Sequence, residues 1–187
     1  ASHLETVLRQ IERQAGDFPR QFVFVDDGAT DDSLAILRDI TAGWKNVVIE
    51  SRANVGSAGA TNRCIALADQ PFIKFVDADD LICDHATVTL LRALKDSEAC
   101  LAFGRQQQYG DVSELDLTSP LGDPATTLLT DGLRMAIKNS LFNPTQFLAR
   151  TEAVKQVGGC DERIVHSQEY SLTLRLARRW TMLEVDA

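Results

Sequence analysis

Cysteine and long apolar runs are scarce in this sequence, and both shortages exclude classes of protein. The 187 residues include four cysteines, none of them in a CxxC pair or at a zinc-finger spacing. No apolar run approaches the ~20 residues of a membrane span, and the first residues do not have the basic start and apolar stretch of a signal peptide. We therefore expect no structural zinc, no redox motif and no transmembrane segment in this chain. A reducing, cytoplasmic compartment fits this cysteine usage, with the cytoplasmic face of a membrane as the alternative location.

Positive charge is scarce as well. Lys and Arg number 19 against 27 Asp and Glu, which gives a formal net charge of -8. Binding along a nucleic-acid backbone needs a basic surface, so we expect no nucleic-acid partner. A phosphorylated ligand can still bind an acidic site if a divalent cation bridges the two.

Short apolar segments alternate with helical patterns along the chain. Apolar runs at 21–25, 46–50 and 72–76 predict strands, and the segments between them have helical periodicity. This alternation predicts an α/β fold with a mostly parallel sheet, and the length suits one domain. Ligands of such sheets bind at the carboxyl ends of the strands, where this chain places its acidic clusters. Further strands are predicted at 99–106 and 146–150, and further helices near 126–139 and at 168–179.

The stretch "DADD" (77–80) directly follows one predicted strand. In an extended segment Asp77 and Asp79 project to the same side. Mg²⁺ and Mn²⁺ prefer oxygen ligands, often one or two carboxylates completed by substrate phosphates. The alternative is a helix start at which Asp80 is the N-cap. The stretch alone supports both interpretations about equally.

Two further stretches lie where strands meet loops. In "VDDGATDDS" (25–33), Asp26 and Asp27 can accept hydrogen bonds from a base N–H or a ribose hydroxyl, although an acidic turn is the simpler interpretation. In "NVGSAGATN" (54–62), a loop with glycines enters a helix whose free N–H groups can hold an anion. A loop glycine needed only for packing explains that stretch equally simply.

The fourth stretch is "GGCDERIVHSQEYSLTLR" (158–175), in which Glu169 opens an amphipathic helix. A carboxylate at a helix start complements the helix dipole, and that is its ordinary explanation. A functional interpretation of Glu169 depends on the other three stretches.

In this order, the four stretches resemble the family 2 glycosyltransferases of the GT-A fold. The family pattern is V-D-D-G-S-T-D-x-S, then N-x-G-x-x-x-A-R-N, then D-A-D-D, and then G-G-F-D-E followed by E-D-x-x-L-x-L-R. The likeness covers residues 3–179. It implies a Rossmann-like, mostly parallel sheet flanked by helices in a single domain, 1–187. Residues 1–100 would form the half that binds the nucleotide-sugar, and residues 101–187 the acceptor-side half.

The resemblance also implies an activity. The enzyme would move a sugar from a nucleotide-diphosphate donor, most often a UDP-sugar, to a hydroxyl group with inversion, using Mn²⁺ or Mg²⁺. The acceptor would be a saccharide, a lipid-linked molecule or a protein, in polysaccharide or glycoconjugate synthesis. Matching positions make Glu169 the general base and Asp79, with Asp77, the metal ligands. The donor nucleotide would contact Asp26, Asp27, Asn54, Gly56 and Asp77.

The chain departs from the family pattern at three important places. Thr61 stands where the family has the Arg of A-R-N. The family's Glu-Asp pair is Gln168-Glu169 here, and the apolar strand with which the family begins does not precede His3. In the family that strand lies between the strands predicted here at 22–25 and 72–76, so we expect a gap at the centre of the sheet and a trimmed domain. These departures motivate an alternative function: a catalytically weakened domain of a larger protein that binds a nucleotide-sugar or docks a partner.

Overall fold

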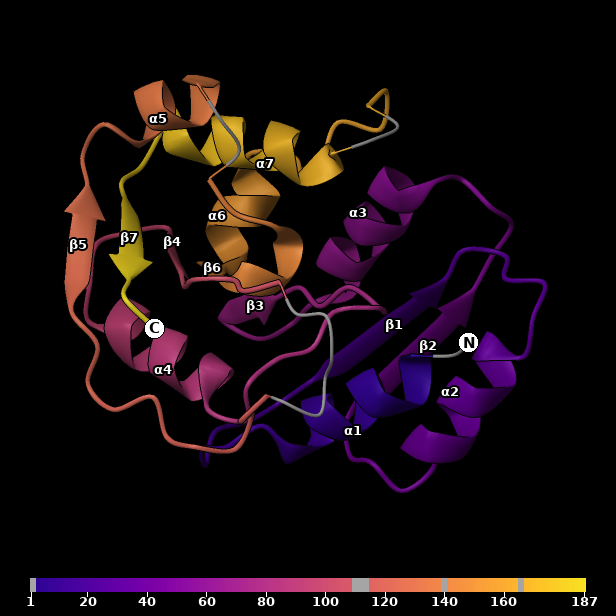
Figure 1. Cartoon of the computed structure of the whole chain (residues 1–187). Coiled ribbons are helices and arrows are strands. Elements are labelled where there is room, and N and C mark those ends of the chain that lie inside the picture. The colour runs from indigo at the N-terminus through magenta and orange to yellow at the C-terminus, as the bar shows by residue number, and fades with distance from the viewer. Residues whose placement is uncertain (1–2, 109–114, 139–140, 165–166) are drawn as a thin grey trace.

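The computed structural model describes residues 3–108, 115–138, 141–164 and 167–187. Helices alternate with short strands along the chain (Figure 1). The elements in order are α1 (Leu4–Arg13), β1 (Phe22–Asp26), α2 (Ser33–Thr41), β2 (Val47–Ser51), α3 (Ser57–Leu67), β3 (Phe72–Lys74), α4 (Ala86–Lys95), β4 (Leu101–Phe103), β5 (Thr126–Leu129), α5 (Gly132–Lys138), η2 (Pro144–Gln146), β6 (Phe147–Arg150), α6 (Thr151–Gln156), α7 (Gln168–Ala177) and β7 (Met182–Val185).

The strands form two sheets, which confirms the α/β class but changes the predicted strand directions. β1 and β2 pair in parallel as a two-stranded sheet, while β3, β6, β4, β7 and β5 form a five-stranded sheet in that order. Among the described strands of the larger sheet, β4 and β7 form the one parallel pair, whereas β6 runs against both β3 and β4, and β5 runs against β7. The larger sheet is therefore mixed rather than mostly parallel, and the smaller sheet is parallel.

The expected gap lies between β1 and β3, which belong to different sheets. No strand of the described residues lies between them, and a cavity of about 880 Å³ occupies the space. We call it the β1–β3 cavity. Its lining is largely apolar and includes Val23 and Val25 of β1, Ile73 of β3 and Leu172 of α7.

The core of the larger sheet alternates between its two faces. Leu101 and Phe103 of β4 pack toward α3, α6 and α7, whereas Ala102 between them packs toward α4. In Figure 1 these three helices accordingly lie on one side of the strands and α4 lies on the other. All three β4 residues are buried, as expected for a strand covered on both faces. Leu172 and Leu176 anchor α7 to the first of these two faces.

Two buried glutamines fasten α1 to the segment that follows residues 77–80, which we call the acidic turn. The Gln10 side-chain oxygen accepts a hydrogen bond from the Ile82 N–H (3.1 Å). The Gln14 side chain donates to the Cys83 carbonyl (2.8 Å) and accepts from the Thr87 N–H (3.1 Å). These bonds satisfy buried backbone groups and fix the path of the chain between residues 80 and 87. No helix in the described part of the chain is both long and apolar enough to cross a membrane.

Candidate functional site

Asp26 and Asp27, at the exit of β1, hold the neighbouring loops. Asp26 accepts hydrogen bonds from the Ala29 N–H (3.0 Å) and the Ser51 hydroxyl (2.7 Å). The two carboxylate oxygens of Asp27 accept the N–H groups of Val55 and Gly56, each at 2.9 Å. Each oxygen has a second lone pair that a ligand can use. The predicted nucleotide contacts of Asp26 and Asp27 stay predictions.

The glycine loop lies directly against the turn after β1. Gly28 has φ +79°, and a Cβ there would meet the Asn54 backbone nitrogen at 3.0 Å. Glycine at 28 therefore allows the two loops to approach each other. Gly56 has φ +90° and is the N-cap residue of α3, and Asn54 is exposed beside it. The structure thus brings Asp27, Asn54 and Gly56 together at one helix start, as the sequence motifs predict for a donor site.

The acidic turn follows β3, and Asp77 is its most constrained member. The Asp77 N–H donates to the Thr145 hydroxyl (3.1 Å), and the Asp77 carbonyl accepts the Asp80 N–H (3.2 Å). Burial, and after it the charges of Asp80, Asp79 and Glu169, together raise the pKa of the Asp77 carboxyl from 3.8 to about 6. Asp79 is exposed on the turn.

The structure excludes Asp80 as a helix N-cap. The next helix, α4, begins at Ala86 with His85 as its N-cap residue. The segment between is held in a non-helical path by the bonds from Gln10 and Gln14 described above. Asp80 instead closes the turn that contains Asp77 and Asp79. The N-cap interpretation of Asp80 is therefore wrong.

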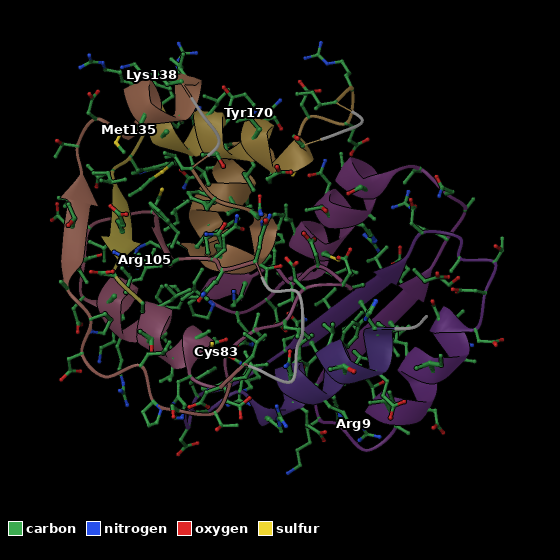
Figure 2. All side chains as sticks on the ribbon, viewed as in Figure 1. Arg9, Cys83, Arg105, Met135, Lys138 and Tyr170 are labelled. Atoms are coloured by element: carbon green, nitrogen blue, oxygen red, sulfur yellow. The ribbon has the colours of Figure 1, made fainter. Side chains whose placement is uncertain are left out.

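Glu169 lies in the first turn of α7 and lines the β1–β3 cavity together with Asp77. Its charge contributes to the raised pKa values of Asp77 and of Cys160, although burial is the larger cause for both. The next residue, Tyr170, donates a hydrogen bond to the Ile137 carbonyl of α5 (3.4 Å), and Figure 2 shows it on α7 beside that helix. The structure therefore brings the predicted base and Asp77, one of the two predicted metal ligands, to one cavity. Asp79, the predicted main metal ligand, does not line it. The donor residues Asp26, Asp27, Asn54 and Gly56 do not line it either, but their neighbours Val25 and Ser57 do.

The acidic turn fits a cation whose remaining ligands come from a substrate. Among the described residues, no group of three or more His, Cys, Asp or Glu is placed to hold a metal on its own. Mg²⁺ and Mn²⁺ sites with one or two carboxylates and substrate phosphates need no such group. The mutual repulsion that contributes to the raised pKa of Asp77 is what a bound cation would relieve.

Sequence reasoning missed two residues that support the acidic turn. The Lys74 ammonium donates to the Thr145 carbonyl, and the Thr145 hydroxyl accepts from the Asp77 N–H. Burial lowers the pKa of Lys74 to about 8, while the charge of Asp80 opposes the shift. A lysine within the apolar run "FIKFV" was the one signal in the sequence. Thr145 gave none, because it lies 68 residues along the chain from Asp77.

This arrangement of helices and strands is the GT-A fold of nucleotide-diphospho-sugar transferases, which solved structures similar to the chain share. Residues 1–158 match the sequence model of glycosyl transferase family 2, and the chain belongs to that family. This confirms the family that the four sequence stretches indicate.

Individual proteins resemble parts or all of the chain. The uncharacterized glycosyltransferase YibD of Escherichia coli is 28% identical over 123 residues, which are 64% of this chain and 36% of that protein. The crystal structure of Staphylococcus aureus TarS 1–349 covers 100% of this chain at 20% identity with a TM-score of 0.74, and its complex with UDP-GlcNAc has a TM-score of 0.71. Mannosyltransferase PcManGT of Pyrobaculum calidifontis, solved with GDP-Man and Mn²⁺, covers 91% at 18% identity with a TM-score of 0.63. The chain spans 54% of the TarS chain and 47% of the PcManGT chain.

Proposed function

We propose that the chain is the sugar-transfer domain of a metal-dependent, inverting glycosyltransferase that uses a nucleoside-diphosphate sugar, with UDP as the preferred nucleotide. The observation that carries the proposal is the approach of Glu169 to Asp77 at one cavity. TarS, solved with UDP-GlcNAc, and PcManGT, solved with GDP-Man and Mn²⁺, support a nucleotide-sugar donor and a divalent cation.

The donor would bind across the carboxyl ends of β1 and β3. Asp26 and Asp27 would contact the base and ribose. Asn54 and Gly56 would lie beside the diphosphate, which the backbone N–H groups at the start of α3 would face. Asp79, with Asp77, would hold Mn²⁺ or Mg²⁺, which when bound neutralises charge on the departing nucleoside diphosphate. Asp77 must be ionised for this role. The Lys74 ammonium interacts with the charge of Asp80 in the same turn.

Glu169 would supply the base. A hydroxyl of the acceptor must lose a proton as it attacks the anomeric carbon, and a carboxylate within hydrogen-bond reach can take that proton. One base and one displacement invert the configuration without a covalent intermediate. Residues 101–187, which carry Glu169, would form the acceptor side for a saccharide, a lipid-linked molecule or a protein. We place the reaction in the cytoplasm or at the cytoplasmic face of a membrane, which suits four free cysteines.

The test is UDP release from UDP-GlcNAc or UDP-glucose in Mn²⁺, compared with EDTA. Replacing Asp79 with Ala should lower the rate at least ~100-fold, because it removes the main protein ligand of the cation. Asp123→Ala, at another exposed aspartate, is the matched control and should release UDP at the wild-type rate. An Asp79→Ala rate equal to that of the control would refute the metal role. If the wild-type chain binds UDP with Mn²⁺ but releases none from either sugar, the alternative of a binding or docking domain is favoured.

A further inference from the structure

Asn62 on α3 binds the segment that precedes α7 through both ends of its side-chain amide. Its oxygen accepts the Cys160 N–H (2.8 Å), and its nitrogen donates to the Cys160 carbonyl (3.0 Å) and to the Glu162 carboxylate (2.8 Å). The partners lie 98 and 100 residues away along the chain. An amide that satisfies both backbone groups of one residue replaces a pair of strand-like hydrogen bonds.

The contact with the Asn62 amide requires glycine at position 159. Gly158 and Gly159 both have positive φ, +77° and +67°, so the backbone turns sharply before Cys160. A Cβ at position 159 would lie 2.3 Å from the Asn62 side-chain oxygen, which no side chain can tolerate without displacement of the amide. The two glycines and Asn62 therefore form one fitted contact between segments that are distant in sequence.

The opposite side of the same segment is bound by α7. The Asp161 N–H donates to the Ser171 hydroxyl (2.9 Å), and the Arg175 guanidinium donates to the Gly159 carbonyl (3.2 Å). Arg175 also forms an ion pair with the Asp161 carboxylate (3.3 Å). Residues 157–162 thus lie between α3 and α7 and are bound to both. We call this segment the clamp.

We propose that Asn62 is a positioning residue for transfer: through the clamp it fixes the start of α7, and so Glu169, relative to the glycine loop at the start of α3. The proposal rests on the proposed function for its effect on turnover, and on the contacts alone for its effect on α7. Asn62 would touch neither donor nor acceptor. Its loss should leave nucleotide binding in place while moving the base away from the attacking hydroxyl, and displacements of about 1 Å can cost ~100-fold in rate.

The first measurement compares Asn62→Ala with Asn46→Gly. Asn46 is a suitable control because its amide also donates to a backbone carbonyl, that of Arg20, and because its φ of +57° tolerates glycine. At a temperature where both variants are folded, Asn62→Ala should lower kcat for UDP release from UDP-GlcNAc in Mn²⁺ at least ~10-fold, with the Kd for UDP within ~3-fold of wild type. Asn46→Gly should change neither. A kcat for Asn62→Ala equal to that of the control, or a loss confined to UDP affinity, would overturn the proposal.

The second measurement needs no turnover. Amide hydrogen exchange at residues 171–174 of α7 should become faster in Asn62→Ala, while exchange in β1 and β2 stays at the wild-type rate. Unchanged exchange at 171–174 would overturn the proposal even if kcat fell. A wild-type chain that releases no UDP would refute the proposed function, whereas the exchange data would still decide whether Asn62 holds α7.

Discussion

Asp77 should destabilise the metal-free protein above pH 6, and its replacement by Asn should reveal the effect. The surroundings raise the pKa of this carboxyl from 3.8 to about 6, with burial as the largest cause. A folded-state pKa above the unfolded value means that the folded chain binds the proton more tightly. The stabilising contribution of this proton is therefore complete below about pH 4 and is lost as the pH rises through about 6.

The size of the effect follows from the shift. A displacement from 3.8 to about 6 corresponds to at most about 3 kcal/mol at ~1.4 kcal/mol per pKa unit. Because the side chain is only partly buried, we reduce this to about 1–2 kcal/mol for solvent screening. Asn has nearly the shape of Asp and bears no charge, and the Asp77 N–H bond to Thr145 involves only the backbone of residue 77. Asp77→Asn should therefore stabilise the protein by about that amount at pH 8, and by about half of it at pH 5, which lies between the unfolded and folded pKa values.

Urea denaturation in EDTA at pH 5 and pH 8 measures this difference, with Asp123→Asn as an exposed control that should show no pH-dependent gain. Addition of Mn²⁺ and UDP should then reverse the order, because only the wild-type chain would gain binding energy at the turn. An equal effect of Asp77→Asn at both pH values, or a loss of stability at pH 8, would refute this reasoning. Burial and charge repulsion would then not destabilise the ionised Asp77 carboxylate in the folded protein.

Two further predictions concern the other site residues. Glu169→Gln should lower kcat for transfer or UDP release at least ~100-fold, since the amide cannot accept the proton, while UDP affinity stays within ~3-fold of wild type. Steady-state rates and UDP titration calorimetry measure the two quantities. Full activity of the variant would show that another residue is the base. Asp27→Ala should lower the free energy of unfolding by about 1–3 kcal/mol and weaken UDP binding, because the Val55 and Gly56 N–H groups lose their acceptors. Urea denaturation and the same UDP titration measure these effects. Unchanged UDP affinity would show that the role of Asp27 is purely structural.

The sequence predicts the fold class and the grouping of the site, but not the strand directions of the second half. The strands at 22–26, 47–51 and 72–74 are where the apolar runs place them, because each run is locally distinct. Residues 126–129, predicted as the start of a helix, instead form β5 along the edge of the sheet. Their conformation is set by pairing with β7, more than 50 residues later, and no strand is predicted from the sequence at 182–185. Long-range pairing of this kind overrides a weak local pattern.

The prediction of the site from the sequence is limited in the same way, because contacts between distant segments are not visible in local patterns. The ordered stretches predict that Asp77 and Glu169 belong to one site, and the shared cavity agrees with this. The sequence does not predict the contacts around these residues. Thr145 binds Asp77 and Asn62 binds Cys160, and these partners are 68 and 98 positions apart along the chain. Residue types and their order identify reactive groups, whereas the hydrogen bonds that orient them depend on which segments pack together.

The most direct test of the proposed function is a crystal structure of the chain with UDP and Mn²⁺. We expect a Mn²⁺ ion bound by an Asp79 carboxylate oxygen at roughly 2.0–2.3 Å and by the UDP phosphates, with uracil and ribose beside Asp26 and Asp27 and the Glu169 carboxylate facing the β-phosphate side. UDP bound away from the acidic turn, or Mn²⁺ held without Asp79, would contradict it.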